Sequence, residues 1–188
     1  MSEDEIRQEY EILERSRSDA RAFGVLYERY FDRIFRFIHR QTDDVDLAAD
    51  LCSQTFLNAL KNVGKYQFRG VPVSAWFYKI ASNEVNKHFR KHKDEKVFSI
   101  EEVRIRELIS QENDDYDEER IQLLVEYMME LPTEMLDVLQ LRFFEGKDFH
   151  EIAFILDITE SGAKMRTYRA LDKLRTRFNL KIKYDGKE

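Results

Sequence analysis

The chain has 188 residues, 43% hydrophobic and 36% charged, which suits one or two small domains and excludes a large enzyme barrel. It lacks the run of roughly 18 to 20 apolar residues that a bilayer helix needs, and its acidic first five residues are unlike a secretory signal. A single cysteine, Cys52, excludes an internal disulfide and suits a reducing compartment. We therefore expect a cytoplasmic protein without membrane insertion.

Only six glycines and two prolines interrupt the chain, which points away from sheets and predicts an all-α fold. The formal net charge of −6 is unevenly spread. Residues 1–93 carry 16 basic and 14 acidic side chains, residues 94–130 carry 4 and 13, and residues 131–188 carry 11 and 10. The acidic excess lies in the middle segment, so the negative net charge of the whole chain does not exclude nucleic-acid binding by either flanking part.

Residues 1–93 are predicted to form a first domain of three helices, because apolar residues recur there at spacings of three and four. Asp19 is the expected N-cap of the first helix, the second ends near Gly64, and Ser74 caps the third. The residues expected to face inward are Phe23, Leu26, Tyr27, Tyr30, Phe31, Ile34, Phe35 and Ile38, then Leu47, Ala48, Leu51, Cys52, Thr55, Phe56, Ala59 and Leu60, then Phe77, Ile80, Ala81, Val85 and Phe89.

Residues 94–118 lose this periodicity and are rich in acids, so we expect an acidic flexible linker. A second helical domain is predicted over 119–188. Its first helix ends before Pro132, which opens the next as a first helical residue; that helix ends at Gly146. The residues expected to face inward on this second helix are Met135, Leu136, Leu139 and Phe143.

The last two predicted helices have the spacing of a helix-turn-helix: a short helix from Asp148, a turn over 157–159 and a longer helix from about Glu160 to Phe178. In that motif the second helix lies in the DNA major groove. Residues 160–183 hold eight basic and two acidic side chains. The side chains expected to face the groove are Glu160, Ser161, Lys164, Met165, Arg166, Tyr168 and Arg169. A solvated basic helix in an ordinary bundle is the alternative.

The loop over 64–72 and the helix after it mix basic and aromatic residues. Single-stranded nucleic acid is held by this combination, because cations follow the backbone and aromatic rings stack on bases. Phe77 fits the inward stripe, whereas Tyr66, Phe68 and Trp76 are better candidates for exposed stacking. Packing of these aromatic residues in a core is the alternative interpretation.

Metal and catalytic sites are not indicated. His88 and His92 have the spacing of a ligand pair, but no third ligand is evident and the neighbouring residues are cationic. His150 and Glu151 begin like a zinc protease helix, yet Phe154 stands where the second histidine would be. We therefore expect no enzyme activity, no cofactor and no metal, with Cys52 as an inert core thiol.

Several segments of the sequence resemble the extracytoplasmic-function group of bacterial RNA polymerase sigma factors, of the sigma-70 family. The segments are AFGVLYERYF at 22–31, DLCSQTFLNA at 50–59, SAWFYKIASN at 74–83, and residues 131–175, which include Glu145-Gly146, Glu151-Ile152-Ala153, Ile158, Lys164 and RALDKLR. The likeness covers about 150 residues. It implies a region 2-like bundle and a region 4-like helix-turn-helix domain.

The resemblance implies a promoter-specificity subunit that binds the clamp and flap of core RNA polymerase. Docking on the clamp would involve Asp50, Gln54, Phe56 and Leu57. The minus-ten promoter element would be recognised and opened by Lys65, Tyr66, Gln67, Phe68, Arg69, Trp76, Asn83, Lys87 and Arg90. The helix-turn-helix would read the minus-thirty-five element. The family also implies an inhibitory anti-sigma partner, and no cofactor, because the polymerase supplies the catalytic magnesium.

The chain departs from the family pattern on the clamp-docking helix. The family usually shows Glu-Asp and then Gln-Glu-Thr-Phe, whereas this chain has Ala49-Asp50 and then Ser53-Gln54-Thr55-Phe56. Because two carboxylates are missing, Phe56 and Leu57 are expected to carry more of the docking. Two other functions stay open on the sequence: a stand-alone helix-turn-helix regulator, and a helical adaptor or small enzyme.

Overall fold

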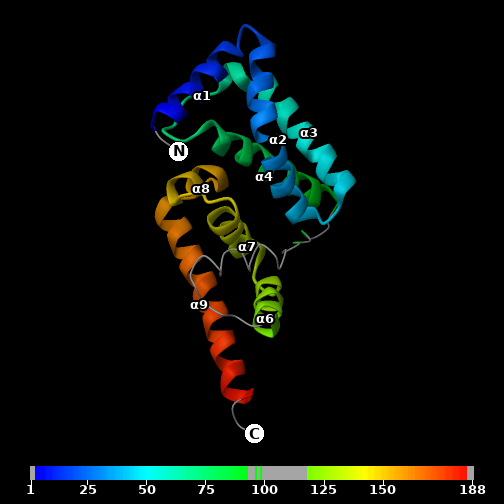
Figure 1. Cartoon of the computed structure of the whole chain (residues 1–188), viewed down its shortest axis with the longest axis vertical. Helices are drawn as coiled ribbons and strands as arrows, with labels where there is room; N and C mark the ends of the chain where they lie inside the picture. The colour runs from blue at the N-terminus through cyan, green and yellow to red at the C-terminus, as the bar shows by residue number, and fades with distance from the viewer. Residues whose placement is uncertain (1–2, 93–95, 97, 99–117, 186–188) are drawn as a thin grey trace. The chain divides into compact units, whose positions relative to one another are not determined.

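The structure, a computed structural model, describes residues 3–92, 96, 98 and 118–185. Within these residues there are eight α-helices and no strand, which confirms the predicted all-α fold (Figure 1). The chain divides into two compact units, one built mainly on the helices up to His92 and the other mainly on those from Glu118 onward. The predicted linker over 94–118 lies almost wholly outside the described residues.

The N-terminal unit contains four α-helices, one more than the sequence predicted. They are α1 (Glu3–Arg15), α2 (Ala20–Thr42), α3 (Val45–Asn62) and α4 (Val73–His92), with a 3-10 turn, η1, at Val63–Lys65. The side chain of Asp19 accepts a hydrogen bond from the backbone of Arg21, which confirms it as the N-cap of α2. Because α4 begins at Val73, Ser74 lies inside its first turn, and the prediction that Ser74 is the cap is wrong.

Aromatic side chains form the core of this unit. Phe77 is 0% exposed, and its ring centroid lies 5.3 Å from that of Phe56, 5.7 Å from Tyr30 and 5.9 Å from Phe23. These rings come from α2, α3 and α4, so burying them holds three helices together. The predicted inward position of Phe77 is confirmed, whereas Tyr27 is 40% exposed and was wrongly expected inside.

The helix that the sequence analysis missed, α1, is fixed to α2 by a buried acid. Glu9 is 1% exposed; it accepts a hydrogen bond from the hydroxyl of Tyr30 and forms an ion pair with Arg29 at 3.1 Å. Burial and the neighbouring Glu9 raise the pKa of Tyr30 far above its ordinary value, so this hydroxyl stays a donor at every physiological pH. Leu13, which is 1% exposed, adds apolar contact. The N-terminal helix is therefore anchored in the core.

The C-terminal unit contains α6 (Glu118–Met129), α7 (Thr133–Leu139), a π-helical turn, η2 (Gln140–Phe144), α8 (Phe149–Leu156) and α9 (Glu160–Asp185). Pro132 is the N-cap of α7 and not its first helical residue. In the π-helical turn the backbone N–H of Glu145 donates to the carbonyl of Gln140 at 3.1 Å, five residues earlier. The wider turn rotates the residues after α7, so Phe143 is 39% exposed and its predicted inward position is wrong.

Cys52 is 0% exposed, and its burial, with a smaller contribution from Asp32, raises the pKa of its thiol to about 12. The burial confirms the expected core position of this thiol, and its low reactivity stays a prediction. At pH 8 the folded chain should hold about a thousandfold less thiolate than a free cysteine, so a disulfide thiol reagent should react far more slowly with native protein than with protein unfolded in urea. Equal rates in the two states would contradict this burial.

None of the helices in the described part of the chain is both long enough and apolar enough to cross a membrane.

Candidate nucleic-acid and protein interfaces

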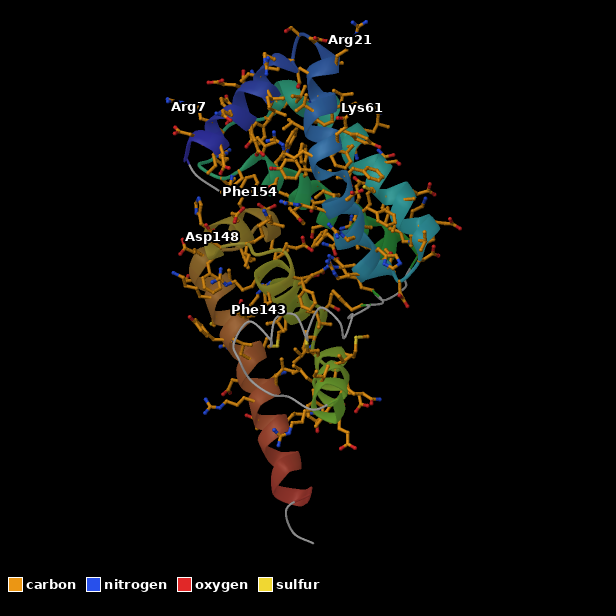
Figure 2. All side chains as sticks on the ribbon, in the orientation of Figure 1. Arg7, Arg21, Lys61, Phe143, Asp148 and Phe154 are labelled. Carbon is orange, nitrogen blue, oxygen red and sulfur yellow. The ribbon has the colours of Figure 1, made fainter. Side chains whose placement is uncertain are left out.

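The helix-turn-helix is shaped by local hydrogen bonds that the sequence encodes. At the start of α8, Asp148 (labelled in Figure 2) accepts from the backbone of Glu151 at 2.7 Å, and Glu151 accepts from the backbone of Asp148 at 3.0 Å. The turn passes through Asp157, whose φ of 53° is left-handed. Thr159 then caps α9 by accepting from the backbone of Gly162 at 3.0 Å. These bonds fix where α9 begins.

One side of α9 is buried and the other is exposed. Ala163, Thr167, Ala170 and Leu174 are all less than a tenth exposed, and they follow each other at spacings of three and four. The residues predicted to face the groove, apart from Arg166, are exposed: Glu160, Ser161, Lys164, Met165, Tyr168 and Arg169. Arg166 lies at the margin and pairs with Glu134 of α7 at 3.8 Å. This face has the position that groove contact requires, and its DNA-binding role stays a prediction.

A cation–π cluster that the sequence analysis missed supports this face. The ring of Phe149 lies 4.9 Å from the guanidinium of Arg142 and 5.8 Å from the ammonium of Lys164, and 6.3 Å from the ring of Tyr168. Lys164 also pairs with Glu160 at 2.7 Å, and this hydrogen bond raises the pKa of the lysine. Helical periodicity does not link Arg142 with Phe149, because Arg142 lies in η2 and Phe149 begins α8.

The loop between η1 and α4 presents one exposed aromatic residue and one buried one. Phe68 is 47% exposed, as expected. Tyr66 is 5% exposed, packs against Trp76 at 4.7 Å between ring centroids, and has its carbonyl held by Arg17 at 2.9 Å. The expectation that Tyr66 is exposed is therefore wrong, because the unpredicted Tyr10 of α1 lies 6.3 Å from its ring. Burial raises the pKa of Tyr66 to about 12.

Polar and basic residues continue from this loop along α4. Lys65 at the end of η1, and Gln67 and Arg69 of the loop, are exposed. The residues predicted to contact DNA on α4 are the half-buried Trp76 and the exposed Asn83, Lys87 and Arg90. Their spacings of seven, four and three place them on one side of the helix. The structure thus leaves the predicted single-strand residues exposed or half-buried, except the buried Tyr66; that they contact DNA stays a prediction.

The four residues of α3 that were predicted to dock on the polymerase clamp differ in their exposure. Asp50 is exposed and Leu57 is 44% exposed, so both are available to a partner. Gln54 donates to Asn58 at 2.9 Å, which ties it to its own helix. Phe56 is 3% exposed and packs among core rings, as its inward position predicted; that it takes part in docking stays a prediction.

No group of three potential metal ligands occurs among the described residues. The rings of His88 and His92 lie 4.3 Å apart, and a ring nitrogen of His92 is 2.9 Å from the carbonyl of His88.

Two protein families match this chain, in the order in which the two units occur. Sigma-70 region 2 matches residues 26–95, and Sigma-70 region 4 matches residues 127–176. The first match covers α2 from Leu26 onward, α3, η1, the loop after it and α4. The second covers the last three residues of α6, then α7, η2, α8 and α9 as far as Thr176. Helix α1 lies outside both matches.

Curated proteins that are similar in sequence to this chain are also described as RNA polymerase sigma factors. The chain is 29% identical over 167 residues to the ECF RNA polymerase sigma factor BldN of Streptomyces coelicolor; the match covers 87% of this chain and 63% of that protein. It is 27% identical over 154 residues to the ECF RNA polymerase sigma factor SigM of Bacillus subtilis; this match covers 82% of this chain and 93% of that protein. The chain therefore spans less than two thirds of BldN and nearly all of SigM.

Two solved structures share the fold. CnrH, solved in complex with the cytosolic domain of CnrY, aligns with a TM-score of 0.61 at 20% identity and covers 92% of this chain and 97% of that chain. RpoE from Bartonella quintana, solved with the anti-sigma factor NepR, aligns with a TM-score of 0.57 at 17% identity. The alignment covers 82% of this chain and 94% of that chain.

Proposed function

Because the chain belongs to the extracytoplasmic-function group of bacterial RNA polymerase sigma factors, we infer that it is an alternative sigma factor that binds core RNA polymerase and directs it to promoters. The observation that carries this inference is the presence of both regions 2 and 4, in that order, on two separate helical units. We further propose that the domains are residues 1–93 and 119–188, joined by the acidic linker over 94–118.

The C-terminal unit is proposed to read the minus-thirty-five element as double-stranded DNA. Its α9 presents Lys164, Tyr168 and Arg169 on the side opposite the buried stripe. A helix placed in this way can set its N-terminal side chains against base edges in the major groove. The ring of Phe149 in α8 lies 5.8 Å from the ammonium of Lys164 and attracts it, which favours one direction of that side chain.

The N-terminal unit is proposed to recognise and open the minus-ten element. The exposed Phe68 offers a ring on which an unpaired base can stack, and Lys65 and Arg69 offer charge to the backbone around it. Lys87 and Arg90 continue this charge along α4. Base stacking of this kind contributes about 1 to 3 kcal/mol per base, which offsets the cost of taking a base out of the duplex.

The inferred sigma factor function also implies protein partners. The exposed Asp50 and Leu57 of α3 are proposed to dock on the polymerase clamp, and the C-terminal unit to contact the flap. CnrH and RpoE were each solved with a protein partner, which supports an anti-sigma partner for this chain as well. We propose that the protein acts in the cytoplasm and supplies promoter specificity without catalysis or a cofactor of its own, since the polymerase carries out the chemistry.

The proposed function is tested by transcription with purified core polymerase on a genomic DNA library. New start sites that depend on this chain are expected, with weak DNA binding when polymerase is absent. Tight binding to a palindromic duplex without polymerase would instead identify a stand-alone helix-turn-helix regulator. Failure to direct core polymerase to any start site would overturn the proposal.

Replacing Phe68 with alanine should spare polymerase binding and reduce strand opening, since the exposed ring is removed while the core is left intact. A loss of one stacked base corresponds to about a 5- to 150-fold weaker open complex. Permanganate reactivity of unpaired thymines measures the opening. Val25→Ala, which also truncates an exposed apolar residue but on α2, is the control. Normal opening by Phe68→Ala would contradict the assignment.

A further inference from the structure

The loop between η1 and α4 is tied to the turn after α1 by a hydrogen bond between distant parts of the sequence. The Nη2 of Arg17 donates to the carbonyl oxygen of Tyr66 at 2.9 Å, although 49 residues separate the two. The backbone N–H of Tyr66 donates to the carbonyl of Val63 at 3.2 Å, so both backbone polar groups of Tyr66 are bonded. Residues 67–70, which follow in the loop, belong to no helix. Arg17 therefore holds the loop at the point where it leaves η1.

The guanidinium of Arg17 is directed by an acid on α1. Glu14 pairs with Arg17 at 2.7 Å across three residues, which is a favourable spacing for an ion pair. The two side chains are 38% and 36% exposed, so burial does not fix either of them. Arg17 also precedes residue 26, where the match to Sigma-70 region 2 begins. The carboxylate of Glu14 thus aims a cation from outside the family match at the loop.

The side chain of Tyr66 is buried at a cost. Its ring lies 6.3 Å from that of Tyr10 and 4.7 Å from that of Trp76, and the residue is 5% exposed. Its hydroxyl is buried and has no hydrogen-bond partner in the described part of the chain. Water would satisfy this hydroxyl if the ring turned outward. The ring contacts and the bond from Arg17 therefore favour the inward position, and the unpaired hydroxyl opposes it.

The position of Tyr66 affects Phe68, because only one residue separates them. Phe68 is 47% exposed, and its ring lies 5.3 Å from that of Tyr10. A backbone rotation at Tyr66 would carry Phe68 away from this place. When only a fraction of the molecules has the competent loop, the apparent affinity for a ligand falls by that fraction. Holding Tyr66 inward thus keeps Phe68 presented in one arrangement.

We propose that Arg17 is a positioning residue for strand opening, which holds the carbonyl of Tyr66 so that the loop presents Phe68, and which does not itself contact DNA. Glu14 belongs to the same arrangement, because it aims the guanidinium. This inference rests on the proposed function and adds to it a residue that acts through the loop. Direct contact of the half-exposed Arg17 with a promoter phosphate is the alternative.

The first measurement uses the free protein. Trp76 is the only tryptophan and packs against Tyr66, so acrylamide quenching of its emission reports whether the ring of Tyr66 is in place. Arg17→Ala should raise the quenching constant about twofold while the protein stays folded in urea titrations. Arg17→Lys, which keeps a donor, should restore the lower value. Adding Tyr66→Phe to Arg17→Ala should also lower it, because the unpaired hydroxyl is removed. An unchanged quenching constant in Arg17→Ala would overturn the inference.

The second measurement uses polymerase holoenzyme formed with the full chain and a promoter that the protein directs. Arg17→Ala should weaken the open complex about tenfold, as expected for loss of a half-exposed charge-assisted hydrogen bond, without changing its salt dependence. Glu14→Ala should weaken it as well. A phosphate contact predicts different results: Arg17→Ala would lower the salt dependence by about one ion, and Glu14→Ala would strengthen binding because a negative charge is removed.

A matched control and the wild type separate the outcomes. Arg21→Ala removes the same charge from an exposed position at the start of α2 (Figure 2) and should change neither quenching nor opening. If wild-type holoenzyme opens the promoter and Arg17→Ala opens it equally well, or Glu14→Ala opens it better, the inference is overturned while the proposed function stands. If wild-type holoenzyme opens no promoter, the proposed function fails, whereas the quenching result still decides whether Arg17 holds the loop.

Discussion

Replacing Phe77 with alanine is expected to lower the free energy of unfolding of the N-terminal unit by about 3 to 5 kcal/mol. The ring is 0% exposed and packs against Phe23, Tyr30 and Phe56 from two other helices. Its removal leaves a cavity at the point where α2, α3 and α4 meet, and the surrounding rings are too rigid to collapse into it. The loss is comparable to the whole stability of many small domains.

The measurement is urea denaturation of the full chain, followed by the fluorescence of Trp76. This is the only tryptophan in the sequence and lies in the same unit, with its ring 5.8 Å from Phe77, so its emission reports the unfolding of this unit. Phe77→Leu should show a smaller loss and keep the protein measurable if the alanine variant does not fold. Val25→Ala, on an exposed side chain, should change stability by no more than about 0.5 kcal/mol. A similar denaturation midpoint for Phe77→Ala and wild type would refute this account of the core.

Replacing Arg169 with alanine should cost about 1 to 3 kcal/mol of discrimination at one base pair of the minus-thirty-five element. Arg169 is exposed on α9, on the side opposite the buried Ala163, Thr167 and Ala170. A guanidinium in this position can donate two parallel hydrogen bonds to a guanine edge, and alanine can donate none. Competition between promoters that differ by single base pairs, with holoenzyme at fixed salt, measures the loss.

Lys173→Ala is the matched control, because it removes an exposed cation one helical turn farther along α9. A lysine that contacts only phosphate should weaken all promoters by a similar factor and lower the salt dependence of binding by about one ion. If Arg169→Ala behaves in the same way as Lys173→Ala, then Arg169 contacts the backbone and the proposed base contact is wrong.

The long periodic helices could be predicted from the sequence, because their apolar stripes persist over five or more turns. Helix α1 was missed because its buried side carries Glu9 where an apolar residue would be expected, and only the structure shows the hydroxyl of Tyr30 that satisfies this acid. Phe143 was misplaced because a π-helical turn breaks the 3.6-residue period after Leu139. Such a turn has no residue pattern of its own and depends on tertiary packing.

The exposure of the candidate site residues was predicted correctly at some positions and wrongly at others. Exposure was correct for Phe68 and for most of the α9 residues, since charge and turn spacing are local properties of the sequence. It was wrong for Tyr66, whose burial depends on the ring of Tyr10 in another helix. A residue type shows what chemistry a side chain can do, whereas its accessibility depends on neighbours that are distant in sequence.

The ion pair and hydrogen bond of Glu9 bear on how this protein can be shortened for biochemical work. A truncated version that begins at residue 26, where the region 2 match starts, would keep Arg29 and Tyr30 but lose the carboxylate that both of them contact. The phenol would then be left in an apolar setting without its acceptor, and the ring of Tyr66 would lose Tyr10. Deletion boundaries chosen from family matches alone would therefore yield a domain in which the surroundings of the loop between η1 and α4 are altered.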